Sequence, residues 1–144
     1  MPYITQNDLL QRMTLQQLTQ LTDDAKTGQP SETVVSGVLE EASGKVDSYV
    51  RSRYTTPLQP CDTATTIARD IAVYLLYSRR PGQMPETVRQ RYEDAMASLK
   101  DIASGKAVLD QPAGSPVPQS TTAGPVKPQR NELRFTDCNM EGFV

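Results

Sequence analysis

The chain has 144 residues, of which 37% are apolar and 22% charged, a length typical of one domain. It contains no histidine, which excludes Ser-His-Asp and Cys-His nucleophiles, histidine-bound zinc and a histidine proton shuttle. Its 15 basic and 17 acidic residues give a net charge of −2, so no overall positive charge attracts the chain to nucleic acid.

The N-terminal segment predicts two short helices. Thr5 followed by Asp8 resembles a capping box that opens a helix over residues 6–13, and Thr14 with Gln17 predicts a second cap. No basic segment precedes an apolar run at the N-terminus, so we expect no signal peptide. No apolar run of the chain approaches the roughly 20 residues needed to span a bilayer, so we expect no membrane partner.

Two longer helices follow, each with apolar residues at helical spacing. Ser31 is placed to cap the first, which is expected to end before Pro57. Gly37 and Gly44 lie near one another on one face of it, which predicts close contact with another helix. Asp62 is placed to cap the second helix, which is apolar almost all round and therefore expected to be central.

The last helix of the body is predicted to have Pro85 in its first turn and Gly105 as its C-cap. Residues 1–109 are therefore expected to form an all-α body, a small bundle of four to five helices. A long extended C-terminal arm follows this bundle. A body of this size buries only about 60–68% of its unfolded surface, so association with copies of itself would add stability.

The composition changes sharply after residue 109. Residues 110–129 contain five prolines and almost no large apolar side chain, which predicts an extended linker because such a segment cannot offset its ordering entropy. In polyproline form the linker would span on the order of 55 Å. Residues 130–144 then regain apolar residues and are predicted to be a docking arm, with folding back onto the chain's own helices as the alternative. The expected anchors of the arm are Leu133, Phe135, Met140 and Phe143.

No catalytic arrangement is found in the sequence. Glu40 and Glu41 are adjacent, so on a helix they point in different directions and do not form a carboxylate pair. The loop at residues 23–28 lacks the alternating oxygen ligands and closing glutamate of a calcium loop. Cys61 and Cys138 are too few for a disulfide framework, and a bridge between them would join a loop to the tail. We therefore expect no enzyme activity, no metal and no cofactor.

The arginines of the body have two interpretations. Arg51, Arg53 and Arg69 could contribute to a DNA-contacting stripe, or could pair with acids such as Glu40 and Glu41 of a neighbouring subunit. Residues 110–144 carry three basic and four acidic residues, so the body has a net charge of −1. That balance favours ion pairs between subunits over nucleic-acid binding.

Several stretches of the chain resemble the Mu-like phage neck proteins. They cover nearly the whole chain apart from the proline-rich linker, and their order and spacing are more specific than any one of them. The loop at residues 23–28 departs from the family pattern because it is shorter and poorer in acids and glycine. The matching stretches are residues 3–10, 47–58 (DSYVRSRYTTPL), 68–77 (ARDIAVYLLY), 88–95, 99–105 and 135–143.

The group is similar in helical layout to the head–tail connector proteins of tailed phages, also called adaptors or head-completion proteins. The resemblance implies a structural protein of the virion neck, assembled in the host cytoplasm. It would form a homo-oligomeric ring, commonly of twelve copies, below the portal protein, and DNA would pass through without sequence-specific binding. The arm would bind the portal or an adjacent copy, and the ring would also meet the next neck or tail-completion protein. The alternative is a small helical DNA-binding or packaging factor, such as a terminase-associated subunit.

Overall fold

The computed structural model describes residues 2–80, 82 and 84–110, and within these ranges the chain is a bundle of five α-helices without a strand. The predicted all-α class and the small bundle are therefore confirmed, whereas the predicted arm and nearly all of the linker lie outside the described residues. None of the described helices is long and apolar enough to cross a membrane. The helices are α1 (Gln6–Leu10), α2 (Leu15–Thr22), α3 (Glu32–Val50), α4 (Asp62–Ser78) and α5 (Glu86–Ser104).

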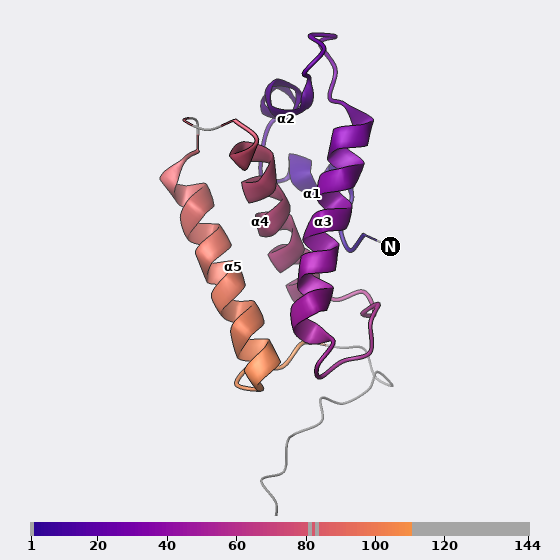
Figure 1. Ribbon diagram of the computed structural model, residues 1–144, viewed down its shortest axis with the longest axis vertical. Helices are drawn as coiled ribbons and strands as arrows, with labels where there is room; N and C mark the ends of the chain where they lie inside the picture. The colour runs from indigo at the N-terminus through magenta and orange to yellow at the C-terminus, as the bar shows by residue number, and fades with distance from the viewer. Residues whose placement is uncertain (1, 81, 83, 111–144) are drawn as a thin grey trace, which may run out of the picture.

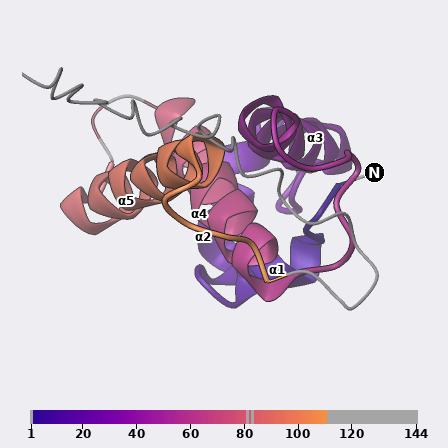
Figure 2. The same cartoon turned by 90° about the horizontal axis from the view of Figure 1, so that it is seen from below.

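Helix α4 is the centre of the bundle and contacts each of the other four helices. Helices α3 and α5 run alongside it, and α1 and α2 cover its other side (Figures 1 and 2). Ile71 and Leu76 of α4 are fully buried, as expected for a helix that is apolar almost all round. The prediction that this helix is central is therefore confirmed.

The bundle has two ends, which carry different loops. At the loop end, at the top of Figure 1, residues 23–28 lie beyond α2 near the C-terminus of α4. At the root end, at the bottom of Figure 1, α3 and α5 both finish and the chain passes toward its C-terminal segment. The two ends are separated by the length of α3, about 28 Å for 19 residues.

The predicted helix starts are partly right. Thr14 accepts a hydrogen bond from the Gln17 N–H at 3.2 Å, and the Gln17 side chain accepts one from the Thr14 N–H at 3.0 Å, which is a complete capping box. The first helix ends at Leu10 rather than at residue 13, because the chain turns there to bury Met13 and to begin the next cap.

Two expected helix starts are displaced by one residue. Asp62 is the first residue of α4, and Cys61 occupies the cap position with its side chain buried. The buried side chain of Cys61 therefore holds this helix start in place, because no side-chain hydrogen bond caps it. Pro85 likewise precedes α5 as its cap residue instead of lying within the first turn.

The close helix contact predicted at Gly37 and Gly44 is wrong for the described part of the chain. A Cβ added at either glycine would have no described heavy atom within 4 Å beyond the neighbouring backbone of α3 itself. Both glycines are exposed on α3. Their small size is therefore not explained by packing within this body.

An aromatic contact joins the three long helices on one side of the bundle. Tyr74 of α4 stacks on Tyr92 of α5 with ring centroids 3.9 Å apart and planes 12° from parallel. Lys45 of α3 donates a hydrogen bond to the Tyr92 hydroxyl at 2.8 Å, and this bond raises the pKa of Lys45. The contact links α3 to α5 across the edge of α4.

Tyr3 fastens the N-terminal segment to α3 and to the loop before α4. Its N–H donates to the Ser43 hydroxyl at 2.9 Å, and its own hydroxyl accepts from the Leu58 N–H at 2.9 Å. The Tyr3 hydroxyl also donates to the Asp47 carboxylate. Burial, together with the hydrogen bond to Asp47, raises the pKa of Tyr3 to about 12. One side chain thus holds α3 and the loop before α4 together.

Replacing Tyr3 by Phe is expected to lower the free energy of unfolding by about 1–3 kcal/mol, because the Leu58 N–H and the Asp47 carboxylate both lose a partner. Urea unfolding followed by circular dichroism measures the change. Tyr49→Phe is the matched control, since Tyr49 is also half-buried and its hydroxyl has no hydrogen-bond partner among the described residues. Equal losses in the two variants would contradict the role assigned to Tyr3.

The raised pKa makes the contribution of Tyr3 depend on pH. The folded state favours the neutral phenol, so the stabilisation is complete below pH 10 and is lost as the pH rises from 10 toward 12. We expect the wild type to lose more stability than Tyr3→Phe over this interval. Unfolding curves at a series of alkaline pH values test this, and parallel losses in the two proteins would count against it.

Candidate functional site

The chain is fixed at the root end just before its C-terminal segment begins. Leu109 is 3% exposed, and its N–H donates to the hydroxyl of Tyr54 at 3.0 Å. Tyr54, which follows the end of α3, is itself 4% exposed. We call residues 105–109 the arm root, because any segment beyond Asp110 starts from this fixed point.

Gly105 and Arg53 form the second contact of the arm root. Gly105 ends α5 with a φ of +82°, a left-handed conformation that favours glycine. A Cβ at Gly105 would overlap the guanidinium of Arg53, which lies against this helix end. The positive guanidinium there is also favourable, because the C-terminus of a helix carries a partial negative charge.

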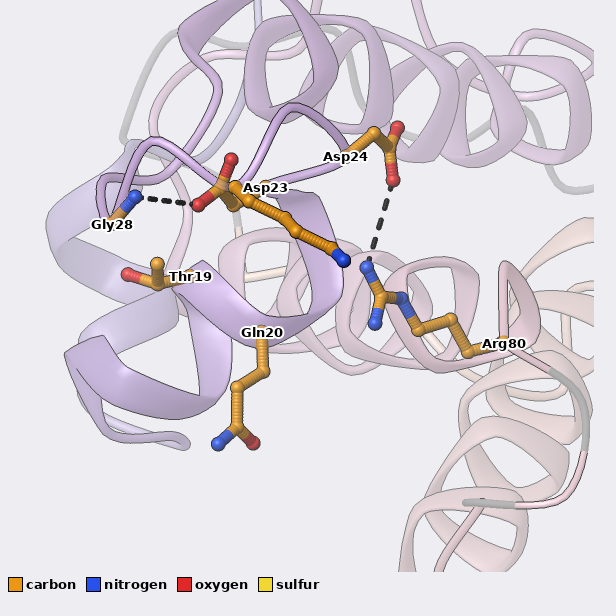
Figure 3. Close-up of a pocket in the computed structure, with 7 residues that line it drawn as sticks. Thr19, Gln20, Asp23, Asp24, Gly28 and Arg80 are labelled. Atoms are coloured by element: carbon orange, nitrogen blue, oxygen red, sulfur yellow. Dashed lines mark hydrogen bonds and ion pairs between the residues drawn. The ribbon is translucent and has the colours of Figure 1, made fainter.

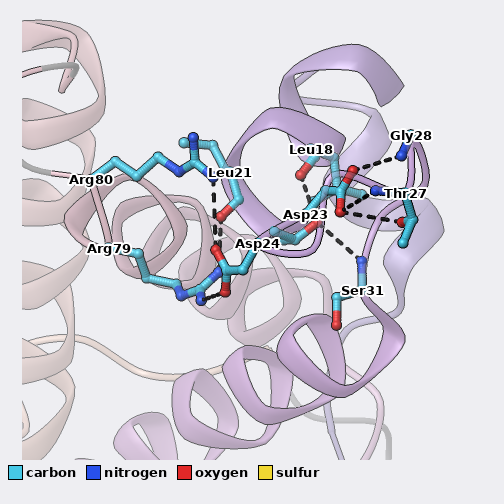
Figure 4. A network of polar contacts seen from close by, with 10 residues as sticks. Leu18, Leu21, Asp23, Asp24, Thr27, Gly28, Ser31, Arg79 and Arg80 are labelled. Carbon is cyan, nitrogen blue, oxygen red and sulfur yellow. Dashed lines mark hydrogen bonds and ion pairs between the residues drawn. The ribbon is translucent and has the colours of Figure 1, made fainter.

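A self-contained loop occupies the opposite end of the bundle (Figure 4). The carboxylate of Asp23 accepts hydrogen bonds from the backbone N–H groups of Thr27 at 2.9 Å and Gly28 at 2.7 Å. These bonds lower the pKa of Asp23. The loop is therefore closed by its own first residue.

Asp24 ties the same loop to the end of α4. Its carboxylate lies 2.6 Å from the guanidinium of Arg79 and 3.7 Å from that of Arg80. Arg79 also donates to the carbonyl oxygen of Leu21 at 2.9 Å. Because two guanidinium groups share one carboxylate, this group of three side chains has a net positive charge.

A shallow pocket of about 350 Å³ lies beside this loop (Figure 3). Its two acids are already engaged, Asp23 with backbone N–H groups and Asp24 with arginines. Among the described residues, no group of three or more His, Cys, Asp or Glu side chains could hold a metal ion. The pocket is lined by Thr19, Gln20, Asp23, Asp24, Lys26, Gly28 and Arg80.

The residues predicted to form ion pairs between subunits lie apart from one another. Glu40, Glu41 and Arg51 are exposed on or at the end of α3. Arg69 on α4 donates to the side chain of Gln11 at 2.6 Å. Neither these four nor Arg53 forms an ion pair within the described ranges, so their pairing with another subunit stays a prediction.

Sequence reasoning missed the ion pairs and the arm root. The ion pairs of the described residues include Arg12–Asp70 at 3.5 Å and Arg89–Glu86 at 2.6 Å. Spacing alone could have found the second, because its partners are three residues apart on one helix. The predicted arm anchors cannot be placed, since Leu133, Phe135, Met140 and Phe143 lie outside the described residues.

Comparison with known proteins gives a family match over most of the chain. The family model described as "Bacteriophage Mu, Gp36" matches residues 3–127. The "Mu-like prophage FluMu protein gp36" of Haemophilus influenzae is 30% identical over 107 residues, which are 74% of each chain. "Gene product J" of Escherichia phage Mu is 30% identical over 120 residues, 81% of this chain and 84% of that protein.

Two glycine substitutions are expected to have opposite effects on stability. Gly105→Ala is expected to lower the free energy of unfolding by about 1 kcal/mol, because φ is positive there, while the flexible guanidinium end of Arg53 has only to move aside from the new Cβ. Gly44→Ala, in open space within α3, is expected to raise it by about 0.5–1 kcal/mol. Thermal or urea unfolding of both variants checks this, and a stabilising Gly105→Ala would contradict the geometry of the arm root.

Proposed function

Because the chain belongs to the bacteriophage Mu Gp36 family, we propose that this phage protein is a structural head–tail connector. In the virion neck it forms a homo-oligomeric ring below the portal protein, and DNA passes through the ring on its way to the tail. It assembles in the host cytoplasm and also contacts the next neck or tail-completion protein. Its role is mechanical and needs neither a catalytic group nor a cofactor.

The observation that carries the proposal is the arm root. A packed bundle holds Leu109 by burial and by the Tyr54 hydroxyl, and residues 111–144 follow this fixed point. Four large apolar residues occur within the last twelve of these. A rigid body with a long appended segment suits a protein that joins larger assemblies.

A ring gives such a joint its strength. In closed rotational symmetry each copy contributes the same modest contacts, and the contacts act together once the ring is complete. The connectors that the sequence resembles commonly have twelve copies. A joint of this kind needs contacts of moderate strength only, which suits a body with few large exposed apolar residues.

The alternative of a DNA-binding or packaging factor has less support. Four arginines of the described residues, Arg12, Arg79, Arg80 and Arg89, already face acids within 4.0 Å. Net charge is −2 for the whole chain, so a basic stripe is not favoured. Steep loss of DNA affinity with rising salt would support the alternative.

Full-length protein mixed with its portal protein is expected to form a ring seated on the portal, visible by electron microscopy. The variant with both Phe135→Ala and Phe143→Ala is expected to lose at least tenfold in assembly, since each tenfold corresponds to about 1.4 kcal/mol and large apolar anchors contribute more than that. The matched control carries Thr121→Ala and Thr122→Ala in the linker and should assemble normally. Absence of a ring with the wild-type protein would overturn the connector role.

A further inference from the structure

A groove of about 490 Å³ lies between the N-terminal half of α3 and the C-terminal half of α4. Its apolar side chains include buried Val38 and the half-buried Val34 and Leu75. Gly37 lies in the groove with open space where a Cβ would be. The groove therefore offers apolar surface and close access to the backbone of α3.

The two ends of this groove differ in charge. Toward the root end lies Glu41, which is exposed and has no ion-pair partner among the described residues. Toward the loop end lies Arg79, which shares the carboxylate of Asp24 with Arg80. A segment that fits the groove should therefore be basic where it meets Glu41 and acidic where it meets Arg79.

The C-terminal segment of this same chain has that order of charges. Residues 130–134 contain two arginines and one glutamate, a net charge of +1, and residues 135–144 contain Asp137 and Glu141, a net side-chain charge of −2. Large apolar residues occur in both halves. We propose that the groove between α3 and α4 binds part of residues 130–144 of a neighbouring copy, with Arg134 toward Glu41 and the acidic residue Asp137 toward Arg79.

Length and direction agree with this arrangement. The segment leaves the body at the root end, so it enters a groove from the side of Glu41 with its basic half first. Residues 111–129 can span about 59 Å at roughly 3.1 Å per residue, about twice the length of α3. The linker is therefore long enough to extend past the groove of its own copy.

Such a contact is head-to-tail, because one copy gives the arm and the next gives the groove. Interfaces of this type close into rings when the rotation between copies permits. The inference rests on the proposed ring and names the contact that links its subunits.

Cysteine cross-linking of the full-length protein tests the proposal. The arm already carries Cys138, and Cys61 is buried, so a Gly37→Cys variant places one new thiol in the groove. Under mild oxidation with copper phenanthroline we expect disulfide-linked dimers and a ladder of larger species, formed at least fivefold faster than in the control. Ser98→Cys is the matched control, because Ser98 is exposed on α5 and is not one of the residues lining the groove.

Three results would overturn the proposal. Equal cross-linking of the two variants means that the groove has no preference for the arm. A disulfide within one chain means that each copy binds its own arm. Cross-links that persist after Cys138→Ser in the Gly37→Cys protein come from groove thiols alone.

A charge exchange provides an independent test. Glu41→Arg and Arg134→Glu should each slow cross-linking in the Gly37→Cys background, and the two together should restore it. Glu40→Arg is the control, because Glu40 is an adjacent exposed acid that does not line the groove. No rescue by the double exchange would overturn the proposed orientation.

The experiments distinguish a failure of the groove proposal from a failure of the connector proposal. If rings form on the portal while the cross-links do not, the connector role stands and the groove assignment is wrong. If the cross-links form and no ring appears on the portal, the copies associate through the groove but the connector role is wrong.

Discussion

The apolar surface of α4 continues almost all round the helix, so it has to be covered from every side. Helices α3 and α5 cover one side and the short α1 and α2 the other. The N-terminal segment is held in place for this purpose by Tyr3, whose hydrogen bonds reach both α3 and the loop before α4. Burial of one central helix therefore dictates where every other helix of the described chain lies.

Both ends of the body are fastened in the same way and near the same place. Tyr3 and Tyr54 each use a phenol oxygen to accept a backbone N–H, from Leu58 and Leu109 respectively. The C-terminal part of α3 and the segment after it thus hold the chain where it enters the bundle and where it leaves. The proposed connector role would need such a base, because tension on residues 111–144 would act on the packed core.

Helical periodicity was enough to predict a bundle of four to five helices and the central position of α4, because both depend on spacing along the chain. The arm root was missed because it joins Arg53 to Gly105 and Tyr54 to Leu109, pairs whose proximity depends on tertiary packing. Gly37 and Gly44 were misinterpreted for a related reason. Small residues predict a close neighbour, but nothing in one copy's sequence says whether that neighbour belongs to the same chain.

The stacked rings of Tyr74 and Tyr92 give the protein a natural optical reporter. The chain has six tyrosines and no tryptophan, so its near-ultraviolet signal is not masked by indole. Stacking with ring centroids 3.9 Å apart couples the two phenols electronically. The ammonium of Lys45 donates a hydrogen bond to the hydroxyl of Tyr92. Any movement of α5 away from α4 would uncouple the pair, so the event is observable by circular dichroism without a dye or label.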